Sequence, residues 1–371
     1  MQMWQFLNPV KIDFGCGQFN RVSEIIDGRP YALVTYDDPV FQDISTRLQA
    51  GAGIPQSIFD HVSPNPSFLD LAVPCEKIKE APPDIIVALG GGSVIDTAKV
   101  LALGTTGFNS VRIYLESKNA SDTLPDSAIP IIAVPTTAGT GSEVTKWATV
   151  WDTESARKYS LSREDLYPTN AVIDPELMLA LPLGQTISTG LDALSHALES
   201  IWNINANPIS SMYAIAASRC ILLHLDKLTN DLNAINHRTA VAEAALYAGL
   251  AFSNTKTALA HSLSYPITLH HGVTHGIACS FTLPSIMRSI IGEDKTVDTC
   301  LSEIFGPDLN AGASQLEKFI KSFNISINPR DHGVEPDTWR EWISDALDGE
   351  RGLNFVGKPE RVSQTLLDAI S

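Results

Sequence analysis

The first half of the chain alternates short apolar runs with amphipathic stretches. Three of the runs have the pattern of buried strands and end in turns of Gly, Pro or polar residues: Tyr31–Thr35, Asp84–Leu89 and Ile129–Val134. Strands that alternate with helices predict a largely parallel sheet. We therefore expect an α/β nucleotide-binding domain over residues 1–181, with ligands beyond the carboxyl ends of the strands.

The second half has a helical pattern. Beyond Leu181-Pro182, strand signals largely vanish, and apolar residues recur with a period of about 3.6 in three long stretches: Asp192–Trp202, Pro208–Leu225 and Arg238–Phe252. This change predicts a helical domain over residues 182–371. The expected fold class is therefore α/β plus all-α.

Two loops after the predicted strands have the composition of phosphate-binding turns. In Gly90-Gly-Gly-Ser93 the backbone can approach a pyrophosphate without a Cβ in the way, and Ser93 is expected to cap the next helix. The loop Thr136-Thr-Ala-Gly-Thr-Gly-Ser142 adds hydroxyl donors at the same sheet edge. A Gly-rich turn without a ligand is the alternative for the first loop alone. The ordinary dinucleotide fingerprint, G-x-G-x-x-G with an acidic residue about 20 positions later, is absent. The acidic residue at a strand end, Asp37, comes before the glycines instead of after them.

Two side chains of the second half, one carboxylate and one imidazole, have the spacing of metal ligands. Asp192 and His196 are four residues apart in a helical stretch, so they share one face and can bind one ion. A surface Asp–His pair is the alternative. Four of the chain's nine histidines follow between His261 and His275, which favours a metal.

The spacing of these later histidines requires a bend. His261 and His275 cannot share a site on one straight helix, because fourteen residues rise about 21 Å. Pro266 and Gly272 are expected to supply the break. One carboxylate with three imidazoles suits Fe(II) or Zn(II).

Composition and charge narrow the classes of partner. The chain has 371 residues and a formal net charge of −16, which disfavours nucleic acid and anionic membranes. Its five cysteines contain no C-x-x-C pair, so neither a disulfide framework nor a thiolate zinc site is indicated. There is no basic and apolar leader, and no apolar run of about 18 residues. We expect a cytoplasmic homodimer that acts on a small molecule.

Taken in order, these segments resemble one family over nearly the whole chain. Gly90–Ser93, Pro135–Val144, Gly190–His196 and the pair His261 and His275-Gly276 are similar to the iron-containing (group III) alcohol dehydrogenases. The resemblance implies a dehydroquinate-synthase-like fold, with a Rossmann-like N-terminal and a helical C-terminal domain. It also implies an NAD(P)-dependent alcohol dehydrogenase or aldehyde reductase that uses one divalent metal.

The resemblance assigns roles to individual residues. The implied metal ligands are Asp192, His196, His261 and His275. The implied cofactor contacts are Asp37, Gly91, Gly92, Ser93, Asp96, Thr136, Thr137, Thr140 and Lys158. Many members of the family have a further histidine, proposed to handle protons, at the position where this chain has Tyr265. The candidates for proton relay in this chain are therefore Tyr265 and His271. Since the Asp37 carboxylate can bind the adenosine ribose and repel a 2′-phosphate, NAD(H) is expected over NADP(H).

Within the family, several stretches look like the phosphonoacetaldehyde reductases. This likeness implies reduction of phosphonoacetaldehyde to 2-hydroxyethylphosphonate, and hence an anion site. Lys256 follows Ser253-Asn254, which we interpret as a helix start, and Lys146 and His270 are further candidates. Ordinary surface groups are the alternative for all three. The other functions considered are a general short-chain alcohol dehydrogenase, a dehydroquinate-synthase-like lyase, and a non-catalytic metal- and nucleotide-binding protein.

Overall fold

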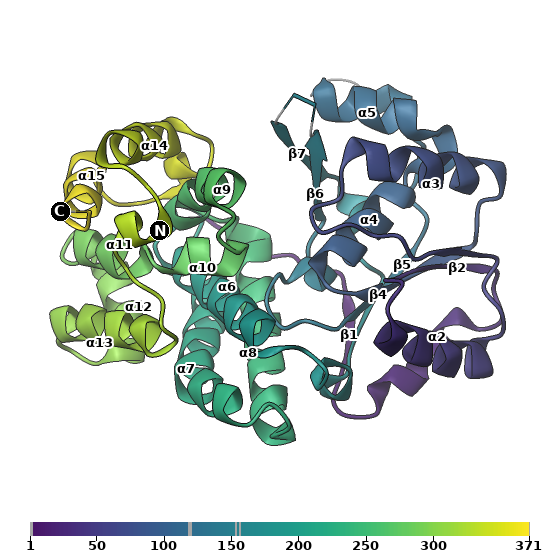
Figure 1. The fold of residues 1–371 in the computed structure, drawn as a ribbon, viewed down its shortest axis with the longest axis horizontal. Coiled ribbons are helices and arrows are strands. Elements are labelled where there is room, and N and C mark those ends of the chain that lie inside the picture. Colours follow the sequence, from purple (N-terminus) through teal and green to yellow (C-terminus); the bar gives the residue numbers. More distant parts are fainter. Residues whose placement is uncertain (1–2, 118–120, 153, 156, 371) are drawn as a thin grey trace. The chain divides into compact units, whose positions relative to one another are not determined.

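The computed structural model describes residues 3–117, 121–152, 154–155 and 157–370. The chain divides into two compact units, and each is described by itself. The α/β unit contains Asn8–Thr137 and Ser142–Ala180. The helical unit contains the chain from Leu181 onward, the segment Ala138–Gly141 and the N-terminal segment up to Leu7. Figure 1 shows strands only in the purple to teal part of the chain.

A parallel sheet of six strands organises the described part of the α/β unit, in the order β1-β8-β5-β4-β2-β3. The three predicted strands correspond to β2, β4 and β5, and their parallel arrangement is confirmed. The strands are β1 Lys11–Phe14, β2 Tyr31–Val34, β3 Ser57–Phe59, β4 Ile85–Gly90, β5 Ile131–Pro135 and β8 Asn170–Ile173.

Helices cover both faces of this sheet, which explains why its inner strands are apolar throughout. Along β4, Ile86 and Ala88 join one hydrophobic cluster, whereas Ile85, Val87 and Leu89 join the other. Figure 1 shows α3, α4 and α5 on one side of the sheet and α2 on the other. The helices are α1 Arg21–Ile26, α2 Pro39–Ala52, α3 Phe68–Glu80, α4 Gly92–Leu101 and α5 Phe108–Glu116.

An antiparallel hairpin adds a feature that the sequence analysis missed. Strand β6 (Trp147–Asp152) pairs with β7 (Arg157–Ser162). Its inward residues Ala148 and Val150 join the cluster on the α3 side of the sheet. The strict alternation of buried and half-buried residues along β6 is the ordinary signal of a strand with one buried face.

The helical unit contains no strand among its described residues. The three predicted stretches lie in α6, α7 and α8, which pack against one another. Its helices are α6 Leu183–Ile201, α7 Pro208–Asn230, α8 Ile235–Thr255, α9 Leu259–His271, α10 His275–Ser280, α11 Leu283–Ile290, α12 Lys295–Phe305, α13 Leu309–Ser322, α14 Pro336–Asp348 and α15 Pro359–Asp368.

Helix α7 is the only described helix long and apolar enough to cross a membrane by length and composition. It begins with Asn207, whose side chain accepts hydrogen bonds from the backbone N–H groups of Ile209 and Ser210. The Ser210 hydroxyl oxygen accepts from the Asn207 N–H in return, completing a capping box. Helix α7 packs against α6, α8 and α12.

Two predicted helix boundaries are wrong. Helix α8 continues through Ser253-Asn254 and ends at Thr255, so Lys256 follows a helix C-terminus instead of starting a helix. The N–H of Lys256 donates to the Phe252 carbonyl, and its positive φ of 65° ends the helical path. Pro266 lies inside α9, and the break comes only at Gly272, with φ 67°.

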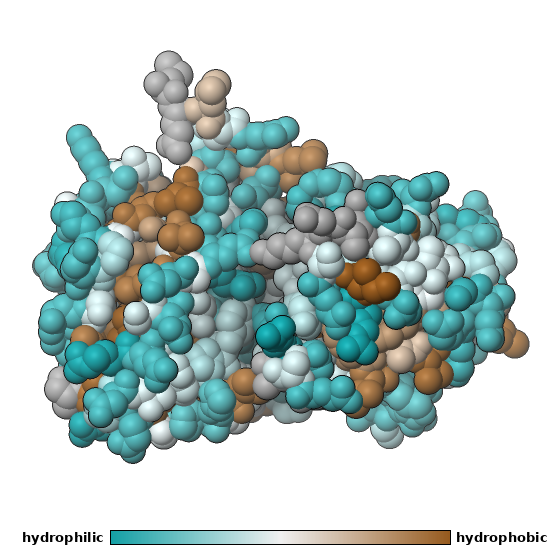
Figure 2. Space-filling model, turned by 90° about the horizontal axis from the view of Figure 1, so that it is seen from above, coloured by the Kyte–Doolittle hydropathy of each residue, from teal (hydrophilic) through white to brown (hydrophobic). Residues whose placement is uncertain are grey.

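The surface is mainly hydrophilic on the face drawn in Figure 2, where apolar side chains form small patches separated by polar ones. The large apolar residues that are exposed are spread along the chain, as at Ile54, Leu69 and Leu353. This pattern accords with a chain of net charge −16.

Candidate metal centre and nucleotide loops

The candidate metal centre lies entirely in the helical unit and begins on α6. Asp192 and His196 are four residues apart on this helix, and both are buried. The Asp192 Oδ1 lies 4.0 Å from the His196 Nε2. The predicted sharing of one helix face is therefore observed.

Helices α9 and α10 bring two more imidazoles to the same carboxylate. The Nε2 atoms of His261 and His275 lie 3.4 Å and 3.9 Å from Asp192 Oδ1. Gly272 reverses the chain between them, because its positive φ ends α9 three residues before α10 begins. The structure thus gathers all four predicted ligands around one carboxylate oxygen.

The approach of α10 to α6 depends on a glycine. A Cβ on Gly276 would lie 1.8 Å from the carbonyl oxygen of Ser188, far inside the contact distance. Only glycine allows this packing, which places the neighbouring His275 beside Asp192.

The centre fits a divalent cation on its own chemistry. Asp192 Oδ1 and His261 Nε2 are buried and have no hydrogen-bond partner among the described residues, an arrangement that is costly unless a further group binds them. Burial raises the pKa of Asp192, but the neighbouring imidazoles outweigh it and hold the pKa below its ordinary value. Burial also lowers the pKa of His196 to about 4, which favours the neutral imidazole that metals bind.

A buried carboxylate that the sequence analysis missed orients His261. The Glu199 Oε2 lies 2.6 Å from His261 Nδ1 and accepts a hydrogen bond from the N–H of Ala258. Its Oε1 accepts from the N–H groups of Ala260 and His261. With Nδ1 engaged, Nε2 of His261 faces the metal position, as in other protein metal sites. The available signal was its spacing, since Glu199 lies seven residues after Asp192, two helical turns along the same face.

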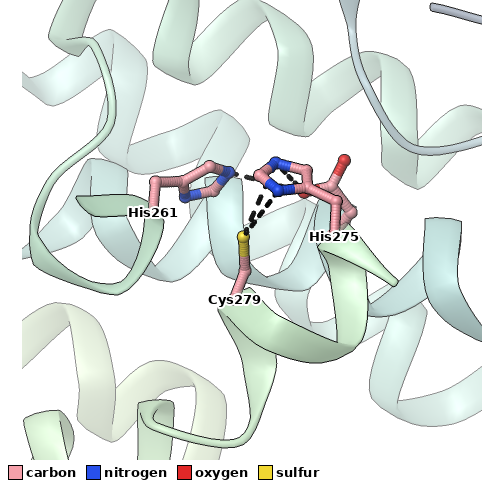
Figure 3. Close-up of side chains that lie close together, drawn as sticks. His261, His275 and Cys279 are labelled. Atoms are coloured by element: carbon pink, nitrogen blue, oxygen red, sulfur yellow. Dashed lines mark hydrogen bonds and ion pairs between the residues drawn. The ribbon is translucent and has the colours of Figure 1, made fainter. Parts of the chain in front are cut away.

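Cys279 also belongs to this centre. The ligand atoms of Asp192, His261, His275 and Cys279 all lie within 4.8 Å of one another, whereas His196 is outside that group. Figure 3 shows the Cys279 sulfur pointing toward the two imidazoles. Burial raises the pKa of the thiol, but the charges of His261 and His275 outweigh it and bring the pKa to about 7. The sequence analysis looked only for paired cysteines and missed it.

The two candidates for proton relay lie in different surroundings. The Tyr265 ring stacks on His275, with the ring centroids 5.9 Å apart and the planes 9° from parallel. His271 is exposed at the end of α9 and meets the Trp342 ring edge-on, with centroids 5.7 Å apart. Only Tyr265 is therefore in contact with a candidate metal ligand.

The predicted anion-site residues do not form one group. Lys256 lies at the C-terminus of α8, so its predicted role beside the free N–H groups of a helix start is wrong. Its ammonium group lies 3.2 Å from the Glu350 carboxylate. Lys146, in the α/β unit, is paired with Glu164. His270 is exposed and stacks on Trp342.

A different cation lies near the metal centre. The Arg351 guanidinium lies over the Tyr265 ring, 5.0 Å from its centroid. The Tyr265 ring in turn stacks on His275, so a single aromatic ring is the link between the guanidinium and this candidate ligand. The Nε of Arg351 donates to the Thr257 hydroxyl. Among the described residues Arg351 has no carboxylate partner. Nothing local in the sequence marks it, because it is distant along the chain from every ligand.

The first nucleotide loop joins β4 to α4 in the α/β unit. Gly91 is the N-cap of α4, which begins at Gly92, so Ser93 lies inside the first turn and the prediction that it caps the helix is wrong. A Cβ on Gly91 would lie 3.2 Å from the Thr137 side chain, which shows that the two loops are closely packed. The free N–H groups of α4 remain suited to an anion.

Asp37 lies at the carboxyl end of β2, as predicted. Its carboxylate is exposed and accepts a hydrogen bond from Gln42. The neighbouring Asp38 is the N-cap of α2 and accepts from the N–H of Val40. Capping is thus performed by Asp38, which leaves Asp37 available to a ligand.

The other predicted cofactor residues surround a buried polar network. Asp96 accepts hydrogen bonds from the Ser142 hydroxyl and the Thr149 N–H, and burial raises its pKa against the opposing charges of Lys99 and Lys158. Lys99, fully buried, donates to the carbonyl and hydroxyl oxygens of Ser142. Thr136 and Thr137 directly follow β5 in the same unit, whereas Thr140 belongs to the short segment grouped with the helical unit.

The glycines of the second loop have a packing role. A Cβ on Gly139 would lie 2.6 Å from the Thr189 carbonyl, and one on Gly141 would lie 2.7 Å from the Gly249 Cα. The Gly139 carbonyl oxygen lies 3.3 Å from His196 Nδ1 and leaves its Nε2 for the metal. These glycines therefore support the metal centre through helices α6 and α8.

Comparison with known families gives matches along nearly the whole chain. The model described as iron-containing alcohol dehydrogenase matches residues 9–175. The model described as Fe-containing alcohol dehydrogenase family, C-terminal, matches residues 186–369.

Individual proteins give the same result. The NAD-dependent methanol dehydrogenase of Bacillus methanolicus is 32% identical over 295 residues, covering 77% of this chain and 76% of that protein. The phosphonoacetaldehyde reductase of Streptomyces viridochromogenes is 38% identical over 210 residues, covering 55% of this chain and 53% of that protein. The structure of sulfoacetaldehyde reductase from Bifidobacterium kashiwanohense in complex with NAD+ matches with a TM-score of 0.89 and 27% identity, over 100% of both chains.

Replacing Glu199 with Gln is expected to weaken metal binding about 10- to 100-fold. An amide offers one acceptor oxygen, so two of the four groups that donate to Glu199 lose their acceptor. Competition with a chelator measures the affinity, and Glu303→Gln, at an exposed position on α12, is the control. Equal affinity in Glu199→Gln and wild type would contradict the orienting role.

Proposed function

The chain belongs to the iron-containing alcohol dehydrogenase family and is an NAD(P)-dependent alcohol dehydrogenase or aldehyde reductase, and we propose that it reduces phosphonoacetaldehyde to 2-hydroxyethylphosphonate. The observation that carries the proposal is the cluster of one carboxylate and three imidazoles, in which the buried atoms Asp192 Oδ1 and His261 Nε2 have no hydrogen-bond partner among the described residues. We assign Asp192, His196, His261 and His275 as the ligands of one divalent metal.

The chain's own residues prepare the site for carbonyl reduction. When bound, the metal supplies Lewis-acid polarisation of a carbonyl oxygen, and the nicotinamide supplies the hydride. Glu199 fixes the orientation of His261, and the Gly139 carbonyl fixes that of His196. Burial of Asp192 and His261 excludes water, which strengthens electrostatic interactions there.

We assign Tyr265, in preference to His271, as the group through which the proton reaches the alcohol product. Tyr265 stacks directly on His275, whereas His271 packs against Trp342. The Arg351 guanidinium lies over the Tyr265 ring and adds a positive charge beside it.

An anionic substrate is supported by Arg351 and by the names of two similar proteins. Sulfoacetaldehyde and phosphonoacetaldehyde are both short aldehydes with an anionic group, and each names a reductase similar to this chain. Arg351 lies over the Tyr265 ring, which stacks on His275, and guanidinium binds phosphonate oxygens in a bidentate manner. A general short-chain alcohol dehydrogenase is the second candidate, favoured by the similarity to methanol dehydrogenase over 77% of the chain.

Three further assignments complete the proposal. We propose NAD(H) as the preferred cofactor, Fe(II) or Zn(II) as the metal, and a cytoplasmic homodimer as the working form. Within the α/β unit, the nucleotide contacts are assigned to the loop Gly90–Ser93, to Thr136 and Thr137, and to Asp37.

Removing the metal is expected to abolish aldehyde reduction. Adding Fe(II) or Zn(II) to the apo-protein should restore it, and His275→Ala should lower kcat/KM by roughly 100-fold or more, because Lewis-acid stabilisation contributes several kcal/mol. NADH oxidation with an aldehyde is the measurement, with metal content checked by elemental analysis. The control His61→Ala alters an exposed histidine of the α/β unit. Full activity in metal-free protein would refute the assignment.

Replacing Asp37 with Ala is expected to shift cofactor preference toward NADPH by about tenfold, or about 1.4 kcal/mol. The physical reason is loss of the carboxylate that repels a 2′-phosphate. The ratio of kcat/KM for NADH and NADPH measures it. Asp38→Ala is the matched control, since Asp38 only caps α2. An unchanged ratio in Asp37→Ala, or a wild-type preference for NADPH, would exclude this role.

Replacing Arg351 with Met is expected to raise KM for phosphonoacetaldehyde about 10- to 100-fold, with little effect on propanal. A charge-assisted hydrogen bond contributes roughly 1.5–3 kcal/mol, which corresponds to that range. Lys256→Met is the control, because Lys256 is paired with Glu350. If wild-type enzyme handles both aldehydes equally well, or if the Arg351 substitution affects both alike, the protein is a general alcohol dehydrogenase.

A further inference from the structure

We propose that the Cys279 sulfur is an additional ligand of the metal, so that the site combines a carboxylate and imidazoles with one thiolate. The inference rests on the metal site of the proposed function and adds a residue to it. As the sulfur–metal bond forms, the thiol proton is released to solvent.

The distances within the cluster match those between ligands of one ion. For metal–ligand bonds of about 2.0–2.1 Å to nitrogen or oxygen and about 2.3 Å to sulfur, tetrahedral ligands lie about 3.4–3.6 Å apart. Asp192 Oδ1 and His261 Nε2 are 3.4 Å apart, and the Cys279 Sγ and His275 Nε2 are 3.7 Å apart. All four ligand atoms, including Sγ, lie within 4.8 Å of one another. Binding of one ion would draw the more widely spaced atoms together, such as His275 Nε2 and Asp192 Oδ1, which lie 3.9 Å apart.

The Cys279 thiol contacts the His275 imidazole directly within the cluster. Cys279 Sγ is almost equidistant from the two ring nitrogens of His275, at 3.8 Å from Nδ1 and 3.7 Å from Nε2. The sulfur therefore lies beside the ring and off the Nε2 lone pair, so a rotation of the half-exposed His275 side chain would be needed to bring Nε2 and Sγ onto one ion. The Ser264 hydroxyl already lies 3.3 Å from His275 Nδ1. In His261, Nδ1 is engaged by Glu199. The His261 ring is thus held with its Nε2 toward the cluster.

The position of Cys279 follows from helix geometry. It lies four residues after His275 on α10, the spacing that Asp192 and His196 have on α6. Two helices therefore each contribute a pair of donors one turn apart. Since Cys279 is completely buried, its sulfur is shielded from solvent and faces the cluster. A thiolate ligand favours Zn(II) over Fe(II), so the inference extends to the choice of metal.

Cobalt(II) provides a direct spectroscopic test on the full-length protein. Wild type loaded with one Co(II) per chain is expected to show the intense near-ultraviolet absorption of thiolate-to-cobalt charge transfer. Cys279→Ser should lose that absorption while still binding cobalt, and Cys300→Ser, at another buried cysteine of the helical unit, should keep it. Identical spectra for wild type and Cys279→Ser at one Co(II) per chain would overturn the inference.

X-ray absorption spectroscopy of the zinc-loaded wild-type protein is a second test, and it does not depend on the folding of a variant. The expected result is a sulfur shell at about 2.3 Å, and a shell of nitrogen and oxygen alone at about 2.0–2.1 Å would overturn the inference. Aldehyde reduction is assayed on the same samples. Active enzyme without a sulfur shell refutes only the Cys279 ligand, whereas a sulfur shell in a protein that reduces no aldehyde refutes only the proposed reaction.

Discussion

The geometry of the metal centre depends on one buried carboxylate, that of Glu199. Its two oxygens accept hydrogen bonds from three backbone N–H groups at the start of α9 and contact the Nδ1 of His261. Ala258, the N-cap of α9, has no side chain that could cap the helix, so a residue of α6 performs this task from a distance. An isolated buried charge costs several kcal/mol, but four donors and the positive helix end offset that cost here. Capping α9 and aiming His261 at Asp192 are therefore one interaction.

In the α/β unit, a buried cation, Lys99, holds separate segments together in a similar way. Lys99 on α4 donates to Ser142 and to the Trp147 carbonyl, and thereby joins the helix of the first loop to the end of the second loop and to the hairpin. Burial lowers the pKa of Lys99 to about 8 against the opposing charges of Asp96 and Glu143, and burial raises the pKa of Glu143 to about 7. Because these groups share one network, the two loops assigned to the nucleotide are mechanically coupled within this unit.

The features that the sequence predicted are those whose signal is local. The strand β4 is continuously apolar, and Asp192 and His196 are spaced by one helical turn, so a short window suffices for each. The prediction failed at Lys256, where Ser253-Asn254 has the composition of a helix start, because the apolar packing of α8 carries the helix on to Thr255. Cys279 and Arg351 escaped notice since their roles arise only when α6, α9 and the segment after α14 pack together. Tertiary packing decides such positions, and local propensity does not.

The way in which the cluster is supported implies that it is formed before any metal binds. Glu199 and Ser264 engage the Nδ1 atoms of two imidazoles, and the absence of a side chain at Gly276 fixes the distance between α10 and α6. Each of these restraints is a contact within the protein, independent of an ion. Within the cluster, the buried atoms that lack a hydrogen-bond partner among the described residues are Asp192 Oδ1 and His261 Nε2. A metal bound by these two atoms would relieve their desolvation cost without ordering the chain, so that its binding free energy would be available for affinity.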